Sequence, residues 1–254
     1  MFNRVVVFVL FCLFVSPACA QTAMEAENDV PAAQGGASTL PPALKDLRAH
    51  VDAEQTMDFK TSFHTSSNVL NIQSEGSAHF LVRKPNQFRI EVSTHNASYE
   101  YVSDGTVLTI YNIAQKSYAQ VAARANVQGN MSLIAGLMGF QARIFDFFAA
   151  LDQASDGLSS VQITPKGAGT VGGRECDRFI VTSMVEKWDV SLEMPAPHLP
   201  CKLVSGDVDD PSATLQVNEF TWEKAPSLTA DTFVFSPPPG SKKTDVGSVL
   251  ASPE

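Results

Sequence analysis

The segment GSAHFLVRKPNQFRIEV, at positions 76–92, alternates apolar and polar residues with a period of two on both sides of a Pro-Asn turn. Successive side chains of a β-strand point to opposite faces, so this segment predicts two paired antiparallel strands with one apolar face each. Those faces cover either a packed core or a hollow that holds a ligand. The residues on them are Ala78, Phe80, Val82, Phe88, Ile90 and Val92.

The same strand signal recurs along most of the chain. In the segment 188–194, WDVSLEM, the alternation directs Trp188, Val190, Leu192 and Met194 inward. A shift of phase within ATLQVNEFTW predicts a β-bulge at Asn218-Glu219. A long antiparallel meander of strongly twisted strands curls into a barrel or a deep half-barrel. Strands are expected near residues 57–67, 72–83, 87–94, 98–103, 106–112 and 116–121, then 160–164, 169–172, 176–183, 186–194, 200–206, 213–223 and 232–236.

Two segments have helical rather than strand periodicity. Residues 42–55 follow a Pro-Pro pair and place Leu44, Leu47 and Val51 on one stripe, which predicts an N-terminal helix. Residues 127–152 have a wide apolar stripe interrupted by Gly136 and Gly139. This insert is expected to form two short helices joined by a glycine hinge, which act as a lid or a plug for the curved sheet.

The N-terminus predicts export. Arg4, a short apolar run and the small residues of ACA form a secretory signal peptide at residues 1–20, cleaved after Ala20, and the apolar run is too short to span a bilayer. A lipoprotein signal with Cys19 as the lipidated residue is the alternative. We expect a disordered spacer at 21–40, one domain at 41–236 and a disordered tail at 237–254. The mature chain is expected to be periplasmic, with no transmembrane span.

Charge and cysteine content narrow the classes of partner. The chain has 18 Lys and Arg against 27 Asp and Glu, a net charge of −9, and no strongly basic patch, so we expect no nucleic-acid partner. Cys176 and Cys201 are the only cysteines beyond the signal peptide. An oxidising compartment favours a disulfide between them, and the alternative is two small buried residues.

Catalytic and metal-binding motifs are not recognisable in the sequence. The histidines at positions 50, 64, 79, 95 and 198 form no metal-ligand pair at helical spacing, and no Gly-x-Ser-x-Gly elbow is present. The acidic segment 205–213, SGDVDDPSA, lacks the glycine and glutamate of a calcium loop and predicts a solvated turn. We therefore expect neither an enzyme nor a cofactor or metal site.

Five segments, in order, carry a resemblance to a known family: FLVRKPNQFRIEV, SDGTVLTIYNIAQKSYAQV, RECDRFIVT, WDVSLEM and DTFVFSPPPGSKK. The chain resembles an uncharacterised family of predicted periplasmic proteins related to the LolA/LolB lipoprotein-carrier fold, over about residues 42–243. The resemblance implies a mainly β fold, a strongly curved antiparallel half-barrel with an N-terminal helix and a helical lid, whose concave face holds lipid acyl chains in the carriers.

The resulting hypothesis is an exported protein that binds a lipid or a lipoprotein acyl chain in the concave face, as a carrier or chaperone and as a monomer. The alternative is a non-catalytic interaction or envelope-sensor module with an envelope protein as partner. Arg83, Arg89 and Arg143 are candidates for contact with a head group, or else form surface ion pairs. The candidate ligand-binding residues are Phe80, Val82, Phe88, Ile90, Trp188, Val190 and Leu192 on the sheet and Ile134, Leu137, Met138, Phe145 and Phe148 on the insert.

Overall fold

The computed structural model describes residues 40–155, 161–207, 209–223 and 228–250. The expected signal peptide, its cleavage after Ala20 and the expected spacer up to residue 39 lie outside the described residues.

Strands are the main regular structure of the described chain, and most of their bounds lie within a few residues of those expected. The two strands expected at 160–164 and 169–172 form one continuous strand over Gln162–Val171, so that division is wrong. The first half contains α1 (Pro42–Ala53), β1 (Thr56–Ser67), β2 (Ile72–Arg83), β3 (Gln87–Thr94), β4 (Ser98–Asp104), β5 (Val107–Asn112), β6 (Ser117–Ala122), α2 (Val127–Met138) and α3 (Arg143–Ser155). The second half contains β7 (Gln162–Val171), β8 (Arg174–Thr182), β9 (Lys187–Glu193), β10 (Pro200–Ser205), β11 (Leu215–Trp222), the 3-10 helix η1 (Ala230–Phe233), β12 (Lys242–Lys243) and α4 (Val246–Leu250).

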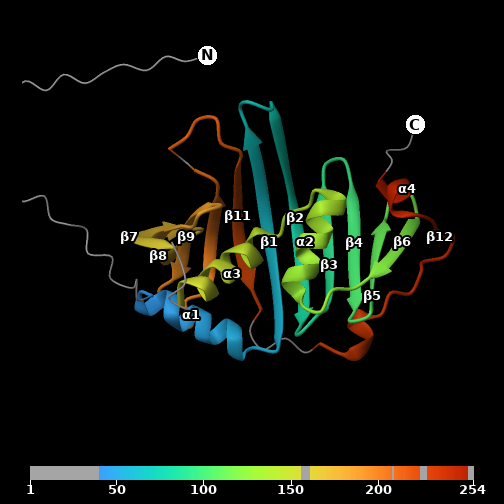
Figure 1. The fold of residues 1–254 in the computed structure, drawn as a ribbon, viewed down its shortest axis with the longest axis horizontal. Coiled ribbons are helices and arrows are strands. Elements are labelled where there is room, and N and C mark those ends of the chain that lie inside the picture. Colours follow the sequence, from blue (N-terminus) through green and yellow to red (C-terminus); the bar gives the residue numbers. More distant parts are fainter. Residues whose placement is uncertain (1–39, 156–160, 208, 224–227, 251–254) are drawn as a thin grey trace, which may run out of the picture. The chain divides into compact units, whose positions relative to one another are not determined.

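All twelve described strands belong to one sheet, in the order β12-β6-β5-β4-β3-β2-β1-β11-β10-β9-β8-β7. Neighbours are antiparallel except β12, which pairs with β6 in parallel. Figure 1 shows α2 and α3 lying across one face of this open, curved sheet, with α1 along its lower edge. The expected fold class is thereby confirmed: a mainly β, curved sheet with an N-terminal helix and a helical insert.

The alternation of residues 76–92 determines which face the helices cover. Phe80 lies opposite Ile90 and Val82 opposite Phe88 in the β2–β3 register, so both apolar sets point to the same concave face. On β1, Phe59 lies next to Phe80, with ring centroids 4.6 Å apart and planes nearly parallel. Phe145 of α3 packs on Phe59 and Phe80 at centroid distances of 6.3 and 6.0 Å. Burial of these apolar surfaces between helices and sheet is the main stabilising term.

The β-bulge expected at Asn218-Glu219 is absent, and that prediction is wrong. The β1–β11 register runs without a shift from Phe59 opposite Trp222 to Ser66 opposite Leu215. The strand keeps its phase because Asn218 itself faces inward, as does Gln216. Both are buried, and the Gln216 amide donates to the Asn218 side-chain oxygen at 3.1 Å. A partnered polar residue therefore occupies a position that alternation alone assigned to an apolar one.

The C-terminal segment also differs from expectation. The strand expected at 232–236 is replaced by η1 and an extended segment. The region expected to be a disordered tail contains β12 and α4 up to Leu250. Order arises there from long-range contacts: β12 pairs with the edge of β6, Val249 is fully buried, and Asn112 donates to the Val249 carbonyl at 3.2 Å.

A disulfide joins Cys176 and Cys201, whose Cα atoms are 7.1 Å apart, as the oxidising compartment suggested. Cys176 lies on β8 opposite Glu193, the last residue of β9. Cys201 lies where the β9–β10 register shifts between Pro200 and Lys202. The bond therefore ties β8 to β10 at the end of the strand between them.

Candidate functional site

The concave face carries a cavity of about 300 Å³ beside the segment that joins α2 to α3. Strands β1 to β4 and β11 form its floor, and Met138, Gly139, Phe140 and Gln141 form its roof. Apolar and aromatic side chains line one part of it and short polar side chains another. The residues on the strands and their turns are Phe63, Thr65, Ser74, Val92, Thr94, Ala97, Tyr99, Tyr101 and Gln216.

Phe140 separates this cavity from a much smaller one. Its ring stacks on Tyr101 at a centroid distance of 5.9 Å and lies 6.3 Å from the rings of Phe63 and Phe80. The small cavity, about 10 Å³, lies between Phe140 and the inward residues of β1 and β11. Phe140 lines both cavities, together with Phe63, Gln141 and Gln216.

The inward positions of the sheet change character at this level. Towards α1 they are apolar, as in Phe59 and Phe80, whereas beyond Phe63 they are Thr65 and Ser74. Gln216 connects the polar part to the roof, since its amide donates to the Gln141 carbonyl at 3.1 Å. The cavity thus has an aromatic inner wall and a polar mouth, an arrangement that suits a ligand with an apolar body and a polar end.

The roof is joined to α2 by a glycine that ordinary side chains do not replace without strain. Gly139 has φ +71°, and its backbone N–H donates to the Ala135 carbonyl, which ends the helix in the left-handed conformation. No atom lies within 4 Å of a Cβ added at Gly136 or Gly139. Of the two expected hinge glycines, Gly139 therefore separates α2 from α3, whereas Gly136 lies within α2, and both are sparsely packed.

Most of the residues that the sequence singled out as ligand-binding lie in the packed core. Phe80, Val82, Phe88, Ile90, Trp188, Val190, Leu192, Ile134, Phe145 and Phe148 are all buried. Only Met138 of the set lines the 300 Å³ cavity. Leu137 is partly buried. Phe145 and Phe148 line a second cavity, about 340 Å³, between α1, α3 and the start of α2.

The aromatic residues of the cavity were not among the expected site residues. Tyr99 and Tyr101 alternate along SYEYVSD, which is a strand signal, and they point inward beside Val92 and Ile90. Burial raises the pKa of Tyr101 far above its ordinary value, so its phenol stays neutral. Phe63 lies over Gly76, where an added Cβ would be 2.7 Å from the ring. The Ser93 carbonyl oxygen would be closer still, and the close approach of this backbone together with the ring explains why glycine occupies that strand position.

The three arginines considered for a head group are engaged elsewhere. Arg83 donates to the Leu228 carbonyl and lies over the Phe233 ring. Arg89 pairs with Glu100 and donates to the Thr232 carbonyl at 2.7 Å. Arg143 pairs with Glu186 at 2.8 Å. Arg83 and Arg89 thus fix the segment around η1 against the sheet, and Arg143 fixes α3 to the β8–β9 connection.

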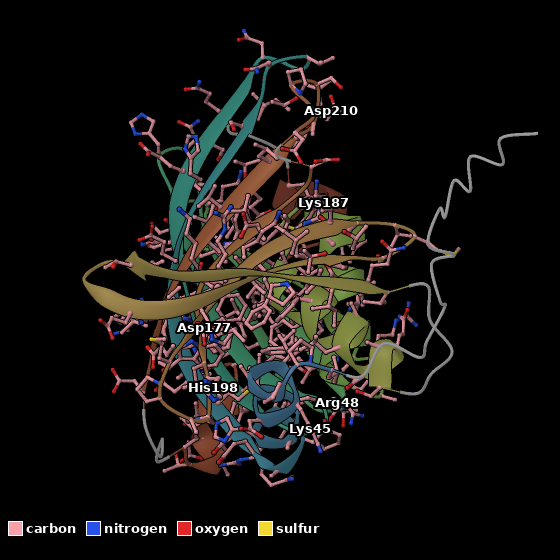
Figure 2. The ribbon with its side chains drawn as sticks, turned by 90° about the vertical axis from the view of Figure 1, so that its left-hand side faces the viewer. Lys45, Arg48, Asp177, Lys187, His198 and Asp210 are labelled. Carbon is pink, nitrogen blue, oxygen red and sulfur yellow. A yellow bond between two sulfur atoms is a disulfide. The ribbon has the colours of Figure 1, made fainter. Side chains whose placement is uncertain are left out.

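The other polar groups considered from the sequence have local partners. His79 lies 2.8 Å from Asp58 on the neighbouring strand. The acidic connection between β10 and β11 pairs with Lys187, which Figure 2 labels. The Lys187 Nζ lies 2.7 Å from Asp207 and 2.9 Å from Asp209. Among the residues that the structure describes, no cluster of three or more His, Cys, Asp or Glu side chains has the arrangement of a metal site.

Comparisons with solved structures give distant similarities. An uncharacterised conserved protein from Thermus thermophilus is 10% identical over 80% of this chain and 96% of its own, with a TM-score of 0.47. Lipoprotein LppX from Mycobacterium tuberculosis is 12% identical over 75% and 100%, with a TM-score of 0.42. MucB in the Pseudomonas aeruginosa MucA/MucB complex is 16% identical over 74% and 59%, with a TM-score of 0.41.

A comparison with curated proteins found no match. Within the part of the chain that the structure covers, no helix is long and apolar enough to cross a membrane. One family model matches residues 43–247, under the description "Predicted periplasmic protein (DUF2092)". That description agrees with the expected localisation, and the match covers nearly all of the expected resemblance. The chain belongs to this family of predicted periplasmic proteins.

Proposed function

We propose that this protein binds one hydrophobic ligand of the acyl-chain class in the 300 Å³ cavity of its concave face, as a non-enzymatic periplasmic carrier or chaperone. The observation that carries the proposal is the division of the cavity into an aromatic inner wall and a polar mouth. Phe63, Tyr101 and Phe140 form the apolar wall, and Thr65 and Ser74 lie at the mouth. A fatty chain would enter with its tail inward and leave its polar end among the hydroxyl groups.

The volume limits how much of a chain the cavity accepts without any movement of its walls. About 300 Å³ is at the lower end of the range for ligand pockets. Burying about six methylenes would contribute about 5 kcal/mol, before the cost of ordering the chain. A longer chain needs more room, which rotation of Phe140 and movement of the hinge at Gly139 would supply. Sparse packing around the hinge supports this opening step.

The apolar residues deeper in the sheet have a different role in this proposal. Phe59, Phe80 and Phe145 form the stacked core that holds α3 in place and closes the inner end of the cavity. Fixing that end makes the hinge segment, rather than the whole insert, the part that moves.

The first test is uptake of a dansyl-labelled fatty acid by protein purified from periplasm without detergent, followed by extraction and identification of any copurified lipid. Ser74→Trp places a large ring at the cavity mouth from an exposed position, so it should weaken probe binding by about tenfold or more. Gln73→Trp is the matched control, because the adjacent residue points to the opposite face of the same exposed strand end.

Equal probe affinities of the two tryptophan variants would place the binding site elsewhere. Absence of both probe uptake and copurified lipid would refute ligand binding and favour an interaction module. Both variants change exposed residues, so both should unfold at the wild-type urea concentration.

A further inference from the structure

The β1–β2 hairpin extends beyond its neighbour on one side. Strand β3 pairs with β2 only as far as Thr94, opposite Gly76. The segment Ile72–Glu75 of β2 therefore pairs with β1 alone. Figures 1 and 2 both show this hairpin rising above the rest of the sheet.

The tip of the hairpin is apolar and exposed. Val69, Leu70 and Ile72 are 67%, 63% and 41% exposed. The ten residues from Thr65 to Ser74, TSSNVLNIQS, contain no charged side chain, although 18% of the chain is charged. Exposed aliphatic side chains gathered at a projecting turn are a feature of contact sites rather than of an ordinary solvated loop.

The tip lies next to the mouth of the cavity. Thr65 and Ser74, which line the cavity, are the residues from which the two strands continue to the turn. Any surface that the tip touches is therefore brought close to the opening through which a ligand enters.

The charge of the protein and the small size of the tip indicate which kind of surface the tip contacts. The acidic β10–β11 connection lies beside the tip, where the Asn68 amide donates to the Pro211 carbonyl at 3.3 Å. Asp210 marks this connection in Figure 2. With a net charge of −9, the protein is repelled by anionic surfaces. The surface area that three aliphatic side chains can bury also falls far short of the roughly 800 Å² that each partner buries in a stable protein complex.

We propose that the tip of the β1–β2 hairpin inserts into the surface of a zwitterionic lipid bilayer and holds the cavity mouth against it while an acyl chain is exchanged. Docking of the tip does not depend on the proposed function. The exchange of an acyl chain rests on it. Because the contact is apolar and small, docking is weak, reversible and insensitive to salt.

The test uses the full exported chain and phosphatidylcholine vesicles that contain a fluorescent phospholipid. Val69→Ser/Leu70→Ser removes the two most exposed side chains of the tip. Met184→Ser/Val185→Ser is the matched control, since these residues are 84% and 90% exposed in the β8–β9 connection, away from the cavity. We expect the tip variant to lose at least about tenfold in vesicle cosedimentation and in the rate of probe transfer, and the control to match the wild type.

Solution binding of the dansyl fatty acid, measured without vesicles, separates the two proposals. Unchanged solution binding together with lost cosedimentation supports docking by the tip. Cosedimentation that is equal in both variants, or that falls steeply as salt rises, overturns the docking proposal while leaving ligand binding intact. Cosedimentation through the tip with no solution binding in any protein supports docking and overturns the proposed ligand binding.

Discussion

Phe145 and Leu137 lie on the same helical insert, yet the structure predicts losses of stability of very different size when each is replaced with aspartate. Phe145 is 5% exposed, and its ring packs against three other aromatic rings at centroid distances of 6.0 to 6.3 Å. Removing such a ring costs about 3–5 kcal/mol, and a carboxylate there adds a desolvation penalty of at least about 1–3 kcal/mol. The sum approaches the roughly 5–15 kcal/mol that stabilises a typical domain.

Leu137 is only partly buried, at the last turn of α2. An aspartate there keeps its carboxylate near water, and we expect a cost of about 1 kcal/mol, to which the helix dipole contributes. Phe145→Leu is the control for the deep site, since it keeps an apolar side chain and should cost less than about 2 kcal/mol.

Urea unfolding followed by tryptophan fluorescence measures all three variants, because Trp188 is buried in the same core. Phe145→Asp should be largely unfolded in water, whereas Leu137→Asp should keep most of the wild-type stability. Equal losses for the two aspartate variants would refute the division of the insert into a packed core and a loosely packed hinge.

Three further predictions concern Gly136 of the insert, the disulfide and the partly buried ion pair of Arg143 and Glu186. Gly136→Ala, in a helical position with no atom near the new Cβ, should stabilise the protein by about 0.5–1 kcal/mol in urea unfolding; a loss would mean that the position is not helical. Replacing Cys176 and Cys201 with alanine opens a link across 25 residues and should cost about 3 kcal/mol in the same assay, whereas an unchanged midpoint would show that the bond does not form. Burial raises the pKa of Glu186 above 4.5, only partly offset by Arg143, so its contribution to stability falls as the pH rises from 4.5 through the raised pKa. Stability of Glu186→Gln measured against pH should lack this fall, and a parallel pH dependence in both proteins would contradict it.

The strands and the helical insert follow from local patterns that the sequence displays clearly. The two paired antiparallel strands expected from alternation form as β2 and β3, and their register places both apolar sets on one buried face. The division of the insert at Gly139 is likewise local, since only a residue that accepts a left-handed conformation ends a helix in this way.

The parts that could not be predicted depend on contacts between distant residues. Asn218 faces inward because Gln216 satisfies its side-chain oxygen, and Gln216 in turn reaches Gln141 of the insert. The C-terminal segment looks disordered by composition, yet it supplies a strand to the free edge of β6. The local sequence around Asn218 does not reveal its contact with Gln216, and the composition of the C-terminal segment does not reveal its pairing with β6.

The same reasoning explains why the cavity was missed. Phe63, Tyr101 and Phe140 come from three separate elements and read individually as core residues. Their cavity exists because the inward positions beyond them are short and polar, as in Thr65 and Ser74. Alternation identified the inward faces of β2 and β3 correctly, but Met194, expected to point inward, lies beyond the end of β9 and is 39% exposed. Alternation also did not indicate at which level along the strands the packing stops.

The position of β1 at the centre of the sheet has a consequence for how the chain reaches its native state. β1 pairs with β2, its neighbour in sequence, and on its other side with β11, about 160 residues later. Each strand from β2 to β6 pairs with its neighbour in sequence, whereas the pairing of β1 with β11, which joins the two halves of the sheet, needs the chain up to residue 222. Such high contact order predicts slow folding. Until β11 pairs with β1, the edge of β1 that binds β11 and the Phe59 ring would be exposed. We therefore expect the folding chain to be prone to aggregation at the edge of β1 until β11 pairs with it.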